Sequence, residues 1–374
     1  MRQRLSVTVM LASLVSAPLQ AQDVQIRGAT FFESYSFDEG LGFDRVSEIS
    51  IPIGVNVALG RYGSIALSSG YASVSVVPTD DAAEDVVISG TLDTEVRLSI
   101  DLIPGRLVAL FTGTVPTGVT SLEQDQLPVL GVIASDLVGF SSATLGAGGN
   151  VGGGFVGAVP VGKMALGFGA TFRRPMTYEP FDGQTTEVRP GAEVRMRGGL
   201  EGPLGRRTYL RVAGVFARRG NDVVDGIDQN GVGNRIIGYI ALNQGVGATS
   251  VTAYIYDIYR GNPQIEETAA GAALLPKGNL FVGGARVDIG VGARTTLTPR
   301  AEYRLSNAAP FDNPDGSLEK LGTTARFGLD LRHRVSPVFA FVVQGGGLVG
   351  TLNQATTDFG ISGYRAALHL EITP

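Results

Sequence analysis

Cysteine and tryptophan are absent from this chain of 374 residues, and histidine occurs only twice. Without cysteine there is no disulfide framework, no thiolate metal site, no cysteine nucleophile and no lipid-modified N-terminal cysteine. Two histidines are too few for a histidine-rich metal site. The sequence therefore predicts neither a bound metal nor a cofactor.

Charged residues are also scarce, and there is no basic excess. They make up 17% of the chain, against about 25% in an average soluble domain. The 30 basic residues are balanced by 35 acidic ones, for a net charge of −5. A nucleic-acid-binding protein concentrates positive charge against phosphates, so we expect no nucleic-acid partner. Glycine is the abundant residue, with 53 positions, about twice its usual share.

Long apolar runs are missing beyond the N-terminus. Residues 1–21 are typical of a secretory signal, because Arg2 and Arg4 precede an apolar stretch and Ala21 supplies the small residue of a cleavage site. No later stretch of about 18 uninterrupted apolar residues follows, so no transmembrane helix is predicted. We expect residues 22–374 to form one exported domain.

From Val24 onward, apolar and polar residues alternate. In the clearest segment, Leu92, Thr94, Val96, Leu98, Ile100 and Leu102 share one face, and Asp93, Glu95, Arg97, Ser99 and Asp101 share the other. Residues 192–197, 325–332 and 365–372 alternate in the same way. Successive side chains of a strand point to opposite faces, so each segment predicts a strand with one apolar and one polar face. A soluble β-sandwich also alternates, but here the polar faces carry mostly charged residues and glycine.

Two kinds of connection separate these segments in strict alternation. Seven are short, at 60–63, 104–106, 160–163, 202–207, 245–247, 292–294 and 335–337. Eight are longer, at 38–44, 78–86, 116–146, 177–187, 220–233, 261–278, 306–320 and 352–358. This pattern predicts an all-β fold, a single antiparallel transmembrane β-barrel of about sixteen strands with short periplasmic turns and longer extracellular loops. Fourteen strands would follow if residues 296–320 held no hairpin.

Over its whole mature length, the chain resembles the Gram-negative outer-membrane β-barrel proteins. General porins and the hydrophobic-compound transporters of the fatty-acid and aromatic-degradation kind are similar in size, and Val115-Pro116-Thr117-Gly118 is similar to a Pro-Thr-Gly of the aromatic-degradation group. The resemblance implies an outer-membrane location, with outer-membrane lipid around the barrel. The chain departs from that class in ending Ile372-Thr373-Pro374, where an aromatic residue is usual. Without tryptophan, the aromatic girdle at the membrane interface is expected to consist of Tyr35, Phe37, Tyr178, Phe181, Tyr254, Tyr256 and Tyr259.

The longest connection, residues 116–146, is too apolar to lie in water. Ser121 and Gln124 have the spacing of a capping box, which predicts a short helix. The glycine-rich segment 146–154 that follows leaves a smooth inner wall. We expect the loop to fold into the barrel, pack on that wall and constrict the pore through Ser121, Gln124, Leu130, Ile133, Leu137 and Phe140. The alternative is a loop that lies on the rim or contacts lipid-facing residues outside.

The alternation also predicts which charges line the pore. They are Asp93, Glu95, Arg97 and Asp101 on one strand, Glu193, Arg195, Arg197 and Arg211 on two neighbouring strands, and Arg326 and Arg332 further round. Separated acidic and basic rows would create a transverse field that orients polar solutes. Alternatively, the charges neutralise one another in pairs and stabilise the wall. The sequence leaves both interpretations open.

No catalytic set emerges from the sequence. His333 and His369 lie near strand ends, and neither has the serine that a barrel phospholipase would need two residues on. We therefore expect no enzymatic activity. Three functions stay open: a channel for passive passage of small solutes constricted by residues 116–146, a plugged transporter for hydrophobic compounds, and a structural or adhesive barrel with a filled lumen. The sequence indicates no oligomeric state.

Overall fold

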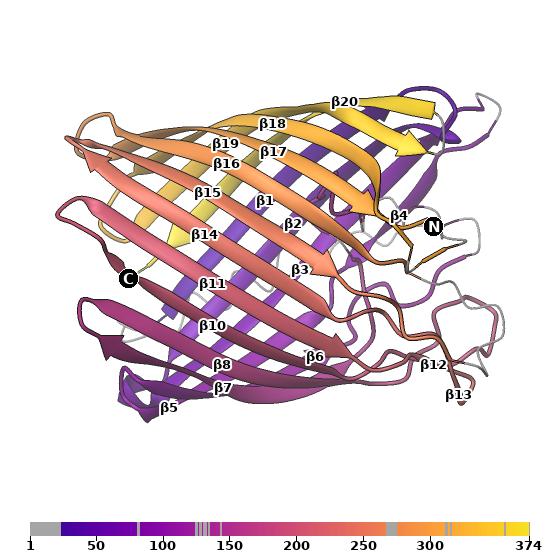
Figure 1. Cartoon of the computed structure of the whole chain (residues 1–374), viewed down its shortest axis with the longest axis horizontal. Helices are drawn as coiled ribbons and strands as arrows, with labels where there is room; N and C mark the ends of the chain where they lie inside the picture. Colours follow the sequence, from indigo (N-terminus) through magenta and orange to yellow (C-terminus); the bar gives the residue numbers. More distant parts are fainter. Residues whose placement is uncertain are drawn as a thin grey trace, which may run out of the picture.

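The strands of the chain close into one barrel (Figure 1). The computed structural model describes residues 24–80, 83–123, 126, 129, 133, 135–142, 144–266, 275–310, 313–314, 316–354 and 357–373, so the predicted signal at 1–21 lies outside it. The barrel strands are β1 (Val24–Phe37), β2 (Phe43–Ala58), β3 (Gly63–Pro78), β4 (Val86–Thr91), β5 (Thr94–Ile103), β6 (Leu107–Val115), β7 (Asn150–Val161), β8 (Met164–Pro175), β10 (Glu193–Pro203), β11 (Thr208–Arg219), β14 (Arg235–Val246), β15 (Thr249–Arg260), β16 (Gly278–Gly290), β17 (Thr295–Ala308), β18 (Glu319–Arg334), β19 (Phe339–Gln354) and β20 (Thr357–Ile372).

Each barrel strand pairs antiparallel with its neighbours, and β1 pairs with β20 to close the sheet. Because β4 and β5 lie end to end along β3, the seventeen strands form sixteen crossing segments. The predicted sixteen-stranded barrel is therefore confirmed. The alternative of fourteen strands is wrong, since β17 and β18 pair from Thr295 and His333 to Ala308 and Glu319.

The short turns gather at one end of the barrel with the C-terminus, and the long loops lie at the other end (Figure 1). A single 3-10 turn, η1 (Gly60–Tyr62), lies between β2 and β3. Gly162 and Gly247 both have φ of 63°, the left-handed conformation that two-residue hairpin turns require. On the loop side, β9 (Val188–Arg189), β12 (Val223–Val224) and β13 (Ile227–Asp228) form a small separate sheet.

The outer surface of the barrel is apolar. Phe111 and Phe327 are 53% and 58% exposed there, whereas the residues on either side of Phe327, Arg326 and Gly328, face the interior through their pairing with Leu348 and Gly346. An apolar outer face and a polar inner face are what a barrel in a bilayer requires. None of the helical segments in the described part of the chain has the length and apolar character needed to span a bilayer.

One residue of the clearest predicted strand lies on the unexpected face. β3 pairs Tyr71 with Thr91 but Ser68 with Glu95, which leaves one extra residue on the β4–β5 side. Such a bulge reverses the facing of the side chains beyond it. Leu92, expected on the outer face, instead packs against the interior apolar cluster.

The predicted aromatic girdle is wrong for four of its members. Tyr35 and Phe37 are buried in the interior cluster, and Tyr254 and Tyr256 pack inside the barrel beside Leu280 and Val282. Their positions in the strand alternation are those of the inward-facing residues: Tyr254 is paired with Gly284, which is in turn paired with Glu302.

Candidate functional site

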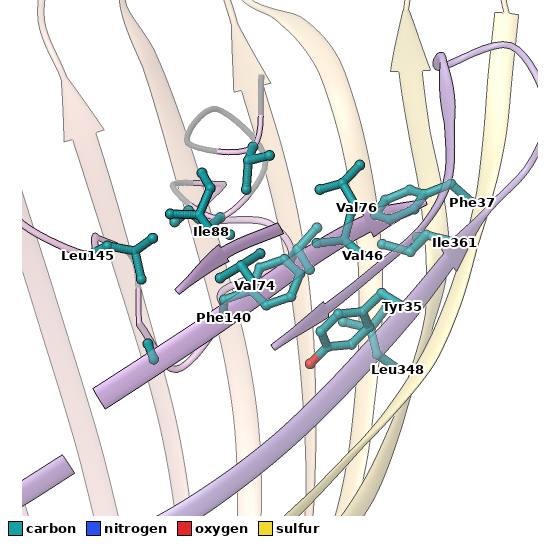
Figure 2. Close-up of a cluster of buried hydrophobic side chains, with 14 of the residues drawn as sticks. Tyr35, Phe37, Val46, Val74, Val76, Ile88, Phe140, Leu145, Leu348 and Ile361 are labelled. Carbon is teal, nitrogen blue, oxygen red and sulfur yellow. The ribbon is translucent and has the colours of Figure 1, made fainter. Parts of the chain in front are cut away.

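The described part of the 116–146 loop packs against the inner wall of the barrel. Its residues Leu122, Val129, Ile133, Val138, Phe140 and Leu145 form one buried cluster with Tyr35, Phe37, Val46, Ala72, Val74, Val76, Ile88, Leu348 and Ile361 (Figure 2). The Phe140 ring meets the Tyr35 ring edge to face, with centroids 5.1 Å apart. Burial of each large side chain contributes about 1.5–3 kcal/mol, so the apolar character of the loop holds it inside.

Two buried carboxylates anchor the end of this packed segment. The Ser141 N–H donates to Glu33 Oε2 at 2.7 Å, and the Ser142 N–H donates to Glu48 Oε1 at 2.9 Å. Both glutamates have no exposed surface. Arg365 Nε lies 3.2 Å from the other Glu33 oxygen. Hydrogen bonds to a charged acceptor are stronger than neutral ones, so β1 and β2 fix the position of the loop backbone here.

A second set of anchors reaches the loop from β17 and β18. Arg304 Nη1 donates to the Asp136 carbonyl at 2.8 Å, and the Thr324 hydroxyl donates to the Leu137 carbonyl at 3.2 Å. Arg326 Nη2 donates to the Gly139 carbonyl, also at 3.2 Å. Three carbonyl groups of the short segment 136–139 are thus held by side chains of the neighbouring strands β17 and β18.

The loop does not pack where the sequence suggested. A Cβ at Gly152 or Gly154 would meet backbone and side-chain atoms of β6 and β8, not of the loop. The described loop residues instead contact the strands from β14 and β15 through the β20–β1 closure to β4. Glycines offer almost no apolar area, whereas β1 to β4 provide the large side chains of Tyr35, Val74 and Ile88. The described residues of the loop therefore pack on β1 to β4 and not, as expected, on the wall formed by Gly152 and Gly154.

A polar cavity of about 620 Å³ lies along the inner face of β11 and of β14 to β19. Its lining includes Tyr209, Arg211, Tyr239, Asn243, Thr252, Tyr254, Arg286, Asp330 and Gln344. Asn243 and Thr252 lie close to the short turn between β14 and β15, so the cavity lies toward the short-turn end. Water-filled space lined by polar groups is suited to hydrophilic solutes.

The predicted pore-lining charges lie on the inner face of their strands, and several are paired. Arg97 contacts Glu95, Arg195 contacts Glu193 and Arg211 contacts Glu201, each at 2.7 Å, and Arg332 contacts Glu371 at 2.6 Å. Asp101 faces inward opposite Val108 on β6. This arrangement favours pairwise neutralisation over separated charged rows.

Arg197 differs from these arginines, because it has no ion pair with any residue that the structure describes. It lies on the inner face of β10, paired in register with Gly169 and Val215. Its guanidinium therefore adds an uncompensated positive charge to the wall that the loop leaves uncovered. Among the described residues, no group of three His, Asp or Glu side chains could hold a metal ion.

Asp93 holds the neck of the loop. Its two carboxylate oxygens accept the N–H groups of Gly118 at 3.0 Å and Ala147 at 2.9 Å. These residues lie where the chain leaves β6 and where it approaches β7. The predicted pore-lining carboxylate is thus occupied by backbone donors at both ends of the loop.

The predicted capping box at Ser121 does not form, and the described helical residues of the loop, Gln126, Val129 and Ile133, come later. Leu122 forms a bridge with Phe181, and its N–H donates to the Pro180 carbonyl at 3.0 Å. The side chain of Gln126 instead accepts the N–H of Glu123, two residues later than the predicted capping box. Ser121 lies beside the 177–187 loop, and the predicted residues Gln124 and Leu130 lie outside the described residues.

The neighbouring extracellular loop is closed by backbone hydrogen bonds. Tyr178 and Val188 exchange two of them, at 2.9 and 2.8 Å. Burial raises the pKa of the Tyr178 hydroxyl, and the nearby Asp222 carboxylate raises it further. Tyr178 therefore stays neutral over the physiological pH range and adds no charge to the mouth of the barrel.

Sequence comparison finds no match: no protein-family model matches the chain, and no curated protein does. Among solved structures, a bacterial polysaccharide outer membrane secretin has a TM-score of 0.51 at 9% identity, over 94% of this chain and 99% of that one. The fold is that of Gram-negative outer-membrane barrels. OccK7 (OpdD) of Pseudomonas aeruginosa has a TM-score of 0.45 at 11% identity, over 94% and 98%. OprD of the same organism has a TM-score of 0.45 at 10% identity, over 96% of this chain and 97% of that one. Identities of this size show a shared fold alone.

Proposed function

We propose that this protein is an outer-membrane channel for passive diffusion of small polar solutes, with the 116–146 loop as its constriction. The observation that carries the proposal is the one-sided packing of the loop. Its described residues contact the inner wall from β14 through the β20–β1 closure to β4 and leave β5 to β11 uncovered, and a polar cavity lies toward the short-turn end of the barrel. A solute path between the loop and the uncovered wall would be polar on its barrel side.

A plugged transporter for hydrophobic compounds fits these contacts less well. Such a transporter needs apolar side chains along its path. The apolar residues of the loop are turned to the wall, and Ile133 and Phe140 are only 1% and 7% exposed. The uncovered wall offers Arg195, Arg197 and inward glycines instead.

A structural barrel with a filled lumen is also less consistent with this interior. Filling requires side chains that pack at the density of a protein core. The inner positions of β7 and β8 include Gly152, Gly154, Gly167 and Gly169, which supply almost no volume. The cavity of about 620 Å³ lies further round the same barrel.

The test is electrical. The protein purified from outer membranes is inserted into planar lipid bilayers, and single-channel conductance is compared with that of a variant lacking residues 119–144. We expect discrete conductance steps from the intact protein and larger steps from the variant. A variant lacking the external hairpin residues 223–228 is the control, and it should conduct like the intact protein. A silent intact protein that opens only on loop deletion would favour a plug, and silence of both would favour a structural barrel.

A further inference from the structure

Two arginines face outward at the extracellular ends of their strands. Arg174 is the residue before the last of β8 and is paired with Val151, and Arg218 is the residue before the last of β11 and is paired with Val194. Val151 and Val194 are exposed on the outer face. Since paired residues of a sheet face the same side, both arginines project away from the lumen.

Neither arginine side chain has an ion pair or hydrogen bond with any residue in the described part of the chain. The adjacent Arg219 faces inward and binds Asp222 Oδ1 at 2.6 Å. The chain therefore neutralises the inward member of this pair of arginines and leaves the outward one, Arg218, exposed.

The two arginines mark the upper edge of the apolar surface. Two residues further into each strand, Phe172 and Phe216 are 49% and 38% exposed on the outer face. An arginine is costly at the middle of a bilayer, but its cost falls to about 0–1 kcal/mol near the interface. This places both guanidinium groups at the level of lipid headgroups.

Only β10 separates the two strands that carry them. Two strand spacings amount to about 10 Å across the sheet, and the register offsets the two arginines by two residues, about 7 Å, along it. Each arginine side chain is long enough to reach toward the other. The guanidinium group binds phosphate through two parallel hydrogen bonds. The nearby loop carries Asp222, Asp225 and Asp228, so the arginines supply a local positive charge beside an acidic surface.

We infer that Arg174 and Arg218 form a binding site for the phosphate groups of a lipid in the outer leaflet. The lipid phosphate lies between the two guanidinium groups, and its acyl chains lie against Phe172, Val194 and Phe216. The site is on the outside of the barrel, so it is independent of the proposed channel function.

The test uses the full protein purified in a non-ionic detergent, with native mass spectrometry to count bound lipid. Diphosphoryl lipid A is the probe, and the double variant Arg174→Gln with Arg218→Gln is compared with the unaltered protein. Loss of charge-assisted hydrogen bonds should weaken binding about tenfold or more. The control is Arg45→Gln, because Arg45 is also exposed at the extracellular end of its strand but is paired with Ser36 and Val77, not beside a second arginine. It should change the affinity less than about threefold.

Three results of the binding measurements would overturn the inference. They are equal binding of the double variant, equal binding of lipid A from which the phosphates have been removed, and competition by inorganic phosphate at the same concentration as the lipid. A shift of the double variant from oligomer to monomer without loss of lipid would also overturn it and would assign the arginines to a contact between copies. A double variant, Arg174→Lys with Arg218→Lys, keeps both charges and is the control for misfolding. It should bind lipid A more tightly than the double glutamine variant does.

Discussion

Glu33 and Glu48 lie directly opposite each other on β1 and β2, and they accept the N–H groups of two consecutive loop residues. Two adjacent buried carboxylates repel each other, and burial away from water is costly. Arg365 offsets part of this cost at Glu33, and the loop backbone supplies donors to both. The position of the loop is therefore tied to a pair of charges that the bare barrel wall would satisfy less well.

Removal of one carboxylate should loosen the loop. In Glu48→Ala the Ser142 N–H loses its acceptor, and an unmet buried donor costs about 1–3 kcal/mol. We expect more frequent transitions to a larger conductance in single-channel recordings. Glu95→Ala is the matched control, because Glu95 is an inner-wall glutamate paired with Arg97 and without a loop contact in the described residues. Equal effects of the two variants would contradict the anchoring role of Glu48.

Removal of the Phe140 ring, the apolar contact of the loop with Tyr35, should also increase the conductance. Phe140→Ala removes a nearly buried ring that contacts Tyr35, and such a truncation costs about 3–5 kcal/mol of packing. We expect a larger mean conductance and a barrel that remains folded, as judged by its resistance to unfolding in detergent on gel electrophoresis. Phe111→Ala, on the outer face, should leave the conductance unchanged. An unchanged conductance in Phe140→Ala would indicate that the loop is held without this ring.

The barrel itself could be predicted because its rules are local. Alternation within a strand and the lengths of successive turns need only neighbouring residues, and they gave the strand count and the inward facing of residues such as Glu95 and Arg197. The bulge that turns Leu92 inward could not be predicted in this way, because one extra residue leaves no local signal.

The part of the inner wall on which the loop packs could not be predicted from the sequence either. Phe140 packs in one cluster with Tyr35 and Val74, which are far from it in the chain. Which side chains lie near the loop depends on the strands that the closure at β1 and β20 brings together. A signal for the missed anchors did exist. Glu33 and Tyr35 share one face of β1, and once Tyr35 is placed in the interior by the strand alternation, Glu33 must be a buried carboxylate that needs partners. The prediction of the aromatic girdle was wrong for Tyr35 because that residue was assigned by its type and not by its place in the strand alternation.

Arg197, an arginine of the uncovered wall without an ion pair among the described residues, should contribute to ion selectivity. Arg197→Gln removes one positive charge from the path proposed for solutes. A unit charge acts with about 1 kcal/mol at 4 Å even in water, so the ratio of cation to anion permeability should rise about fivefold. Reversal potentials across a potassium chloride gradient measure this ratio. Arg294→Gln, in a short turn outside the lumen, is the control and should leave it unchanged, and a shift of the same size there would indicate a general surface-charge effect.

Asp93 should control the stability of the loop neck, because one carboxylate serves both ends of the loop. Asp93→Asn keeps one acceptor oxygen but turns an amide N–H₂ toward the second backbone donor, so either Gly118 or Ala147 loses its hydrogen bond. A lost charge-assisted bond of about 1.5–3 kcal/mol should speed amide exchange at one of these residues about tenfold or more, as measured by hydrogen–deuterium exchange with mass spectrometry. Asp101→Asn is the matched control, since Asp101 is an inward aspartate of β5, the strand that begins directly after Asp93, and its side chain accepts no backbone N–H among the described residues. If exchange at both neck amides stays as slow as in that control, the loop neck is held by its other contacts, including the Leu122–Phe181 bridge.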